Sequence, residues 1–482
     1  MSTNTAPTAT TPSTETTRPG PSRQGAILAI ILVSYFMIVL DNSIVFTGLA
    51  SIREDLGFST AGLSWVQNAY ALVFGGLLLL GARAGDIFGR RRMFVIGLVI
   101  FSLASLAIGL SPNGGWMLGA RAVQGVGSAI LAPTSLALLT ATFAEGPERT
   151  RAVAGYGSVA GLGASFGLVL GGVLADLLSW RVGFLVNVPI GIILLVAVLR
   201  FVPAGSTTRG RIDIGGAISS TIGMTLVVYA ITRTAETGWR DPFTLGFLSV
   251  GILCVGAFVL IEWRAAHPIL PLRVFVNRVR TGAFLARLLF AGAMFGYFFF
   301  VSQYMQGVLG FTPLQAGLGF LPMSVVQFIV AVNVSRLTRR FGNSALLIIG
   351  LIITTVGMLW LSRVDVDSSY VVAVALPMVL LGLGQGLGFA PLTAAGITAI
   401  EPRDAGAASG LVNVAHQLGG ALGVSIMVAV AAAGNISTTN PAGIAGQTMD
   451  GITTGAILLV LAIVAAAVLI VPGARATTKA LT

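Results

Sequence analysis

Long apolar runs separated by short polar segments fill the chain from about residue 26 to residue 472. A helix needs roughly 20 apolar residues to cross the hydrocarbon core of a bilayer, and runs of that length recur along the sequence. The predicted spans are 26–49, 62–82, 93–112, 116–142, 151–176, 182–202, 212–232, 243–265, 281–306, 313–335, 344–363, 371–397, 404–433 and 452–472. The pattern predicts an all-α integral membrane protein with fourteen transmembrane helices.

The basic residues fall on one side of this predicted topology. With the N-terminus inside, the external segments hold few of the 28 Lys and Arg residues: Arg53, Arg181, Arg233, Arg240 and Arg363. Arg121 and Arg287 lie within spans, and all the others fall in internal segments. Loops rich in Lys and Arg stay in the cytoplasm. We therefore expect a protein of the cell inner (cytoplasmic) membrane with both termini cytoplasmic.

The composition agrees with a membrane protein. Hydrophobic residues make up 55% of the chain and charged residues only 9%, whereas soluble domains carry about 25% charged residues. The net charge of +11 sits in short loops, so it sets the topology and does not indicate nucleic-acid binding. Cys254 is the only cysteine, and His267 and His416 are the only histidines. No disulfide within the chain is possible, and neither a metal site nor a cofactor is expected.

The second half of the chain repeats features of the first half. The segment GDIFGRRRMF at 85–94 has a degenerate echo, RLTRRFGNSA, at 336–345, and QGVG at 124–127 is echoed by QGLG at 385–388. The glycine-rich fifth span likewise resembles the thirteenth. Parallel repeats of six spans are one architecture of secondary transporters, with the substrate site at the interface of the repeats.

The repeats divide the chain into two bundles with additional segments. We expect a disordered cytoplasmic tail at 1–24 and an N-terminal six-helix bundle at 25–203. An extra helix pair with its linker follows at 204–266, then a C-terminal six-helix bundle at 267–473 and a cytoplasmic tail at 474–482.

Asp41 is the only acidic residue well inside a predicted span. An ionisable residue within a membrane is costly and marks a functional site by default. At a rise of about 1.5 Å per residue, Asp41 and Arg121 fall at similar depths toward the external face. Burial favours the neutral carboxyl and a nearby Arg favours the carboxylate. The pair is therefore a candidate for proton coupling, with the alternative that Arg121 snorkels outward and Asp41 is only structural.

Other polar and aromatic residues within spans are candidates for a substrate cavity: Gln124, Phe295, Phe298, Tyr304, Gln327, Gln385 and His416. Each has a structural alternative. The glutamines can tie helices together, and a lone histidine can bond a backbone carbonyl. The aromatic run in the ninth span covers all sides of the helix, so part of it is expected to meet lipid. Arg287 is expected to snorkel toward the internal face.

A turn with an acid and several bases joins the second and third spans. Gly85 and Gly89 let two helix ends approach closely, and Asp86 is placed to pair with Arg90 or with a helix N-terminus. The structural alternative is a basic loop that only sets the topology.

Several of these motifs resemble those of the major facilitator superfamily. The loop residues Gly85, Asp86, Gly89 and Arg90 resemble its short cytoplasmic motif, which implies a latch on one conformation. The segment from Arg121 to Gln124 resembles its fourth-span motif. In the fifth span, the ridge made by Gly163, Gly167 and Gly171 resembles its antiporter motif, although Leu168 stands where the family has a proline.

Two further segments resemble the fourteen-span drug:proton antiporter family, the EmrB/QacA-like group. They are SWRVGFLVNVPIG at 179–191 and LDNSIV at 40–45. The resemblance extends from the first span to the last. It implies the major facilitator fold, with two six-helix bundles plus two extra central helices.

The resemblance and the buried charges together predict a proton-coupled multidrug efflux transporter that works by alternating access. Its expected substrates are small, bulky amphipathic or hydrophobic compounds, with cationic ones as one candidate class. A dedicated exporter of one secondary metabolite or antibiotic stays open. A channel or membrane-embedded enzyme is disfavoured, because neither polar rings nor a catalytic dyad is evident. The expected partners are protons, the lipid bilayer and the substrate, with no nucleic acid, for a protein that functions as a monomer.

Overall fold

In the computed structural model, the chain is described over residues 21–143, 146–203, 213–265, 268–401, 404–433 and 440–472. Most of the predicted N-terminal tail, the linker 204–212, His267 and the C-terminal tail lie outside these ranges. Helix α1 begins at Pro21, within the predicted tail.

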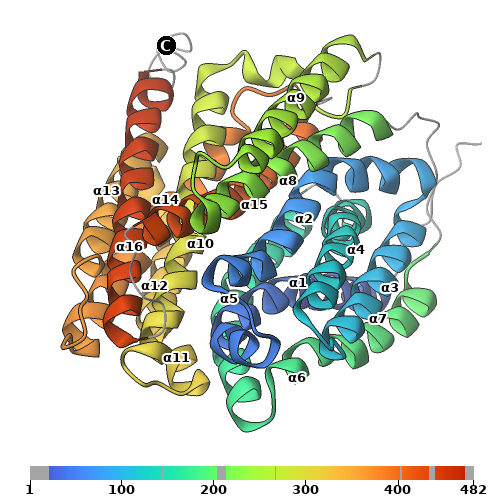
Figure 1. Ribbon diagram of the computed structural model, residues 1–482. Coiled ribbons are helices and arrows are strands. Elements are labelled where there is room, and N and C mark those ends of the chain that lie inside the picture. The colour runs from blue at the N-terminus through green and yellow to red at the C-terminus, as the bar shows by residue number, and fades with distance from the viewer. Residues whose placement is uncertain are drawn as a thin grey trace, which may run out of the picture.

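The described residues are almost entirely helical and contain no strand (Figure 1). The first bundle consists of α1 (Pro21–Leu56), α2 (Thr60–Phe88), α3 (Arg90–Gly109), α4 (Gly114–Thr142), α5 (Pro147–Leu177), α6 (Trp180–Leu185) and α7 (Asn187–Phe201). The second consists of α10 (Arg278–Gly307), α11 (Pro313–Gly319), α12 (Leu321–Phe341), α13 (Asn343–Leu361), α14 (Leu376–Gly396), α15 (Ala405–Ala433) and α16 (Pro441–Ala465). Between them lie α8 (Ile214–Thr237) and α9 (Pro242–Arg264). Short helical turns are η1 (Leu272–Phe275), η2 (Val371–Ala375) and η4 (Ala466–Ile470).

Thirteen helices in the described ranges are long and apolar enough to cross a membrane. They coincide with thirteen of the predicted spans, with α6–α7 and α11–α12 each forming one span in two pieces. The remaining predicted span, 151–176, falls on α5, in which Gly163–Leu177 is a shorter apolar stretch. The all-α membrane fold is confirmed.

The two largest differences from the predicted boundaries are at the start of the last span and the end of the first. The last span was predicted from residue 452, but α16 already begins at Pro441, because Asn440 caps it by accepting a hydrogen bond from Gly443. Asp450 therefore lies within a helix. Helix α1 extends beyond residue 49 to Leu56, and Asp41 lies near its middle.

The two bundles repeat the same helix packing at the QGVG and QGLG motifs. A side chain added at Gly97 of α3 would lie 3.0 Å from the carbonyl oxygen of Gly127 of α4. In the second bundle, one added at Gly350 of α13 would lie 2.8 Å from the amide nitrogen of Gly388 of α14. Each motif therefore lets two backbones touch, which is how small residues favour helix association in membranes.

The extra pair lies across one seam between the bundles. Helix α8 packs against α2 of the first bundle and α15 of the second, while α9 packs chiefly on α8 (Figure 1). The hydroxyl of Ser425 on α15 accepts hydrogen bonds from Asn68 of α2 and Thr232 of α8, at 2.8 and 2.9 Å. One small side chain thus joins both bundles to the extra pair.

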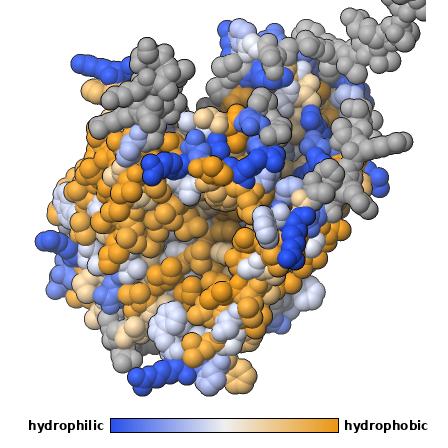
Figure 2. Space-filling model, turned by 90° about the horizontal axis from the view of Figure 1, so that it is seen from above, coloured by the Kyte–Doolittle hydropathy of each residue, from blue (hydrophilic) through white to orange (hydrophobic). Residues whose placement is uncertain are grey.

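The bundles are closed against each other at the predicted external end. Gly317 of α11 packs against the backbone of Leu168 of α5, and Thr312 donates a hydrogen bond of 3.0 Å to Asp176 at the end of α5. Ser302 of α10 donates to the carbonyl of Phe46 on α1. Seen from above, the opposite end is hollowed between two lobes (Figure 2). The structure thus has its cavity open toward the predicted internal side.

Candidate functional site

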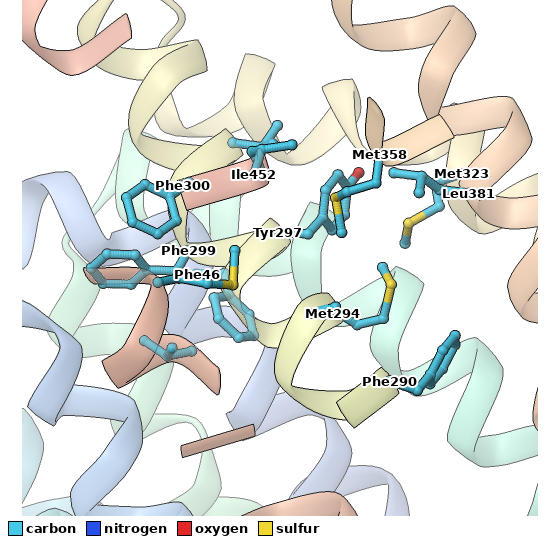
Figure 3. Close-up of a cluster of buried hydrophobic side chains, with 14 of the residues drawn as sticks. Phe46, Phe290, Met294, Tyr297, Phe299, Phe300, Met323, Met358, Leu381 and Ile452 are labelled. Atoms are coloured by element: carbon cyan, nitrogen blue, oxygen red, sulfur yellow. The ribbon is translucent and has the colours of Figure 1, made fainter. Parts of the chain in front are cut away.

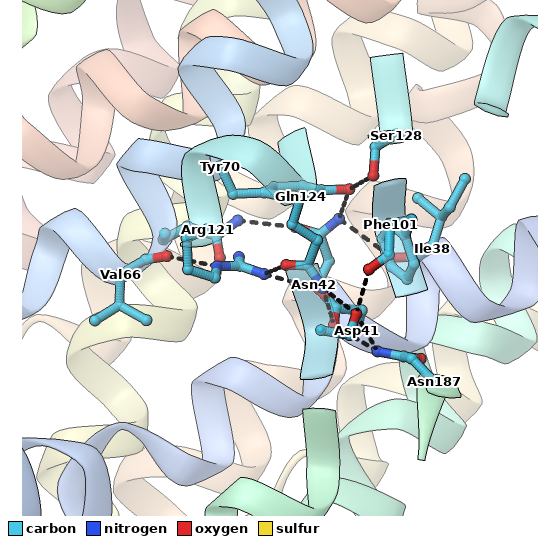
Figure 4. Close-up of polar contacts among 12 residues, drawn as sticks. Ile38, Asp41, Asn42, Val66, Tyr70, Phe101, Arg121, Gln124, Ser128 and Asn187 are labelled. Carbon is cyan, nitrogen blue, oxygen red and sulfur yellow. Dashed lines mark hydrogen bonds and ion pairs between the residues drawn. The ribbon is translucent and has the colours of Figure 1, made fainter. Parts of the chain in front are cut away.

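Asp41 and Arg121 form a fully buried ion pair. Arg121 Nη1 lies 2.7 Å from Asp41 Oδ2, and both side chains are 0% exposed (Figure 4). Asp41 projects from the middle of α1 and Arg121 from the second turn of α4. The structure therefore brings together the two charges that the depth argument placed at the same level, and Arg121 does not snorkel outward.

Neutral donors complete the surroundings of the carboxylate. Oδ1 of Asp41 accepts hydrogen bonds of 2.8 Å from Gln124 of α4 and from Asn187 at the start of α7. Both amides also donate to the hydroxyl of Ser105 on α3, at 2.8 and 3.4 Å. Four helices of the first bundle thus converge on one carboxyl group, and Gln124, which we predicted to line a substrate cavity, takes part in this cluster.

The guanidinium of Arg121 is held from several sides. Nε donates to the carbonyl of Val66 on α2 at 2.9 Å, and Nη1 also donates to Gln124 at 2.6 Å. The group lies 4.4 Å from the ring centroid of Tyr70, within the range of a cation–π interaction. Nη2 has no hydrogen-bond partner in the described structure. The cation is therefore fixed in place with one donor still free.

A second chain of polar groups leads away from the ion pair along α2. Tyr70 donates a hydrogen bond of 2.9 Å to Ser128, and Asn42 donates to the Tyr70 oxygen at 3.2 Å. Gln67 in turn donates to Asn42 at 3.0 Å. Asn42 follows Asp41 in the sequence and is half-buried. These hydrogen bonds therefore run from the buried ion pair to a partly accessible face of α1.

This arrangement ties the protonation of Asp41 to the state of Arg121. Protonating the carboxyl group would leave a buried cation without its counter-charge, which costs several kcal/mol unless the surroundings change. A change of access that hydrates either group relieves this cost. The cluster can therefore couple proton uptake to a conformational change.

The predicted glycine ridge on α5 sets the position of α1 around Asp41. Side chains added at Gly163 and Gly167 would lie 3.1 Å from Val39 Cγ1 and from the Leu40 carbonyl oxygen. One added at Gly171 would lie 2.8 Å from Ile44 Cα. The ridge therefore contacts α1 immediately before and after Asp41, even with Leu168 in the place of the proline.

We expect Gly171→Ala to destabilise the protein by about 1–3 kcal/mol, as overpacking of a tight contact does. Gly157→Ala is the matched control, because it lies on the same helix with no atom within 4 Å of the added carbon. It should be neutral or stabilise the helix by up to about 1 kcal/mol. Thermal unfolding in detergent measures both; equal melting temperatures would show that the ridge does not constrain α1.

The latch residues lie at the junction of α2, α3 and α4. Arg90 Nη2 lies 3.4 Å from Asp86 Oδ1, and both side chains are more than a third exposed. Arg90 Nη1 also donates to the carbonyl of Ala137 near the end of α4, at 3.1 Å. Gly89 has a φ of 95°, which favours glycine, and Gly85 packs against Thr134. The four predicted residues are brought together.

The predicted cavity residues separate into different environments. Phe295 and Phe298 of α10 are half-buried at the junction with α1, where Phe298 stacks on Phe46 with 5.2 Å between ring centroids. Figure 3 shows their buried neighbours Phe299 and Phe300 in the same hydrophobic cluster as Phe46. Tyr304 is buried and donates a hydrogen bond of 2.7 Å to the carbonyl of Asp365, so it anchors a loop. The expectation that part of this aromatic run meets lipid was wrong, because α1, α14, α15 and α16 enclose α10.

The remaining glutamines, Gln327 and Gln385, lie on α12 and α14, which pack against each other. Gln385 of α14 is 6% exposed, and its amide nitrogen lies 3.4 Å from the sulfur of Met323 on α12, which ties two helices together. Gln327 is half-buried beside Gly386 of α14.

His416 and Arg287 lie together in the second bundle. Arg287 is 3% exposed, and its guanidinium carbon lies 3.8 Å from the ring centroid of Phe389. The expectation that it snorkels to the surface was wrong, since its side chain is buried among aromatic residues of the second bundle. The ring of His416 contacts Phe295 edge to face at 5.3 Å, and its Nδ1 has no hydrogen-bond partner in the described structure. The carbonyl bond considered for it is therefore not made through Nδ1.

Sequence reasoning missed Asn187, Ser105 and Tyr70 as members of the ion-pair cluster. Asn187 stands in the stretch 179–191, where it was part of a family motif without a role of its own. Asn187 could have been identified as a candidate because it is a polar residue about one turn into an otherwise apolar predicted span. Ser105 and Tyr70 offer no such signal, because serine and tyrosine are common in membrane helices.

The chain belongs to the Major Facilitator Superfamily, whose family profile matches residues 31–424. Its sequence is 41% identical to the cephamycin export protein of Amycolatopsis lactamdurans, over 88% of each chain. It is 38% identical to the puromycin resistance protein of Streptomyces alboniger, over 88% of this chain and 86% of that one. It is also 35% identical to the lincomycin resistance protein of Streptomyces lincolnensis, over 84% and 83%.

Solved structures share the fold at low sequence identity. A peptide transporter in complex with sulfate matches with a TM-score of 0.68 and 14% identity, over 93% of this chain and 94% of that one. A bacterial homologue of the human lysosomal transporter Spinster, in an inward-facing conformation, matches with a TM-score of 0.64 and 15% identity, over 94% and 98%.

Proposed function

We propose that this protein is a proton-coupled exporter of amphipathic drugs or antibiotics, working by alternating access between its two bundles. The proposal is supported by the family, by relatives named for antibiotic export or resistance, and by the hollow between the bundles. It places the protein in the cytoplasmic membrane as a monomer with both termini inside. The proton gradient would supply the energy, with no cofactor.

The observation that carries the proposal is the sealed pair of Asp41 and Arg121. Its carboxylate accepts three hydrogen bonds and is 0% exposed. In our scheme, Asp41 takes up a proton when the external end is open and releases it toward the interior when the pair closes as seen here. Release of the proton re-forms the ion pair, which stabilises the inward-open state and readies it for the next substrate.

A dedicated exporter of one antibiotic is the second candidate, and the relatives favour it as strongly. Three of them carry the names of single compounds: cephamycin, puromycin and lincomycin. The two candidates differ in breadth of substrate and share the same coupling mechanism.

A susceptibility panel separates these possibilities. Cells expressing the protein would be compared with vector controls against several structural classes of antibiotic, with and without an uncoupler. Protection against several classes that the uncoupler abolishes indicates a multidrug exporter, and protection against one class indicates a dedicated exporter. Protection that persists with the uncoupler would refute proton coupling.

We expect Asp86→Asn to slow transport by about tenfold, within the usual range of conformational coupling energies, while leaving folding intact. Asp86 is exposed enough that losing its bond to Arg90 costs little stability. Glu148→Gln is the control, since Glu148 is an exposed acid at the predicted internal end of α5. Gly89→Val should also impair transport, but its φ of 95° adds backbone strain. Initial export rates measure transport, and melting temperatures measure stability. If Asp86→Asn lowers the melting temperature enough to explain the slower transport, the latch role is contradicted.

A further inference from the structure

Arg287 differs from the other buried arginines in the described ranges. Arg121 is paired with Asp41, and Arg280 donates to the carbonyls of Val274, Thr398 and Ala399. Arg287 is as deeply buried, yet its Nε and Nη1 have no hydrogen-bond partner and no described carboxylate forms an ion pair with it. A buried cation without a counter-charge is strongly unfavourable. An intramembrane residue of this kind is by default a functional site awaiting a partner.

The groups that contact Arg287 and its neighbour His416 are aromatic. Its guanidinium lies against Phe389 of α14, and His416 of α15 lies between Phe389 and Phe295 of α10, with an unpartnered Nδ1. Phe389 is 38% exposed, so the ring that covers the guanidinium is itself accessible. Ligand sites commonly combine such an apolar lining with a few oriented polar groups.

The first bundle also contributes to this cluster. Tyr35 of α1 lies within electrostatic range of Arg287 and stacks on Tyr156 of α5, with 3.9 Å between ring centroids. The free guanidinium donors therefore lie where the two bundles face each other. In a transporter built from two repeats, this interface is where substrate is bound.

We propose that Arg287 binds an oxyanion, above all a carboxylate, on the amphipathic substrate, with Phe389, Phe295 and His416 contacting the substrate's apolar or aromatic body. This rests on the proposed export function and specifies its substrate class. Because the charge of Asp41 is already neutralised by Arg121, Arg287 keeps a positive charge that no described carboxylate balances. The site thus favours acidic or zwitterionic compounds over the cationic class.

The test is a binding titration with the full-length protein in nanodiscs of neutral phosphatidylcholine. The probes are dansyl-phenylalanine, an amphipathic carboxylate, and its neutral amide, which share one fluorophore and differ in charge. Wild-type protein should bind the acid more tightly than the amide. Arg287→Gln should weaken binding of the acid by about tenfold or more, which is the contribution of a charge-assisted hydrogen bond. Binding of the amide should stay unchanged. Arg287→Lys should retain part of the preference.

Arg278→Gln is the matched control, because Arg278 is an exposed arginine in the first turn of the same helix. If Arg287→Gln weakens acid and amide alike, or wild-type protein does not prefer the acid, the assignment is wrong. Discs containing anionic phosphatidylglycerol distinguish the source of the oxyanion. If the acid binds wild-type protein as tightly in these discs as in neutral ones, Arg287 belongs to a substrate site. If the anionic lipid weakens binding of the acid to wild-type protein but not to Arg287→Gln, the site binds a lipid headgroup and the proposal is overturned.

The binding assay is independent of export, so the two proposals can fail separately. Arg287-dependent binding of the acid without export driven by a proton gradient would refute only the export function. Export driven by the gradient with no preference for the acid would refute only the oxyanion site.

Discussion

Asp41→Asn is expected to abolish export driven by a pH gradient while leaving the protein folded. Asparagine keeps the shape of aspartate but cannot ionise, and only one of its two terminal atoms can accept a hydrogen bond. The site can accommodate the amide, because Asn187 Oδ1 is buried without a hydrogen-bond partner and can accept from the new N–H group after a flip of the Asn187 side chain. Exchange of substrate across the membrane without a gradient should survive, since it needs only the conformational change.

Everted vesicles with a pH-sensitive dye measure the proton released on adding substrate. Asp176→Asn is the control, because Asp176 is an exposed carboxylate whose described role is to accept a hydrogen bond from Thr312 at the closed external end. It should leave proton release intact. Undiminished proton release in Asp41→Asn would move the coupling site elsewhere, with Asp176 and His416 the first residues to test.

The second large effect is expected for Arg121→Gln, which should destabilise the protein by about 3–5 kcal/mol. Removing one partner of a buried ion pair leaves the other charge uncompensated, and here the carboxylate of Asp41 would remain at 0% exposure. Glutamine also loses the hydrogen bond to Val66 and the cation–π contact with Tyr70. The measurement is unfolding in detergent, with Arg278→Gln as the control.

A double-mutant cycle separates the charge effect from the loss of packing. The double variant Asp41→Asn, Arg121→Gln removes both charges, so it should recover a substantial part of the stability that Arg121→Gln loses. Additive losses would show that the two charges do not interact energetically, and would also undermine the coupling scheme. Proton release should be absent from the double variant.

Part of the site was predictable because charges in a membrane are rare. Asp41 and Arg121 stand out against apolar neighbours, and the rise of a helix was enough to place them at one level. Asn187 and Ser105 were not predictable in the same way. Their role depends on how α3 and α7 turn their faces toward α1, and such rotations are set by packing between helices instead of by local pattern.

The fold was predictable for the same reason, with specific exceptions. Length and hydropathy identified all thirteen helices that are long and apolar enough to cross a membrane in the described ranges, because the bilayer fixes both properties. The start of α16 was missed because 440–451 is rich in small and polar residues, yet an asparagine cap and Pro441 suffice to begin a helix there. The burial of the aromatic run on α10 was also missed, because hydropathy shows that a helix is apolar but does not tell lipid from protein as its surroundings.

The turn between α8 and α9 has a practical consequence for imaging this molecule. At 49.5 kDa, and with nearly all its described mass in membrane helices, the protein offers few features for aligning particle images. The turn at Gly238–Asp241 joins two long helices, one of them anchored to both bundles through Ser425. A rigid helical domain grafted there as a continuation of α8 and α9 would extend from the micelle in a fixed direction. The extra helix pair thus offers a fiducial for visualising the transport cycle.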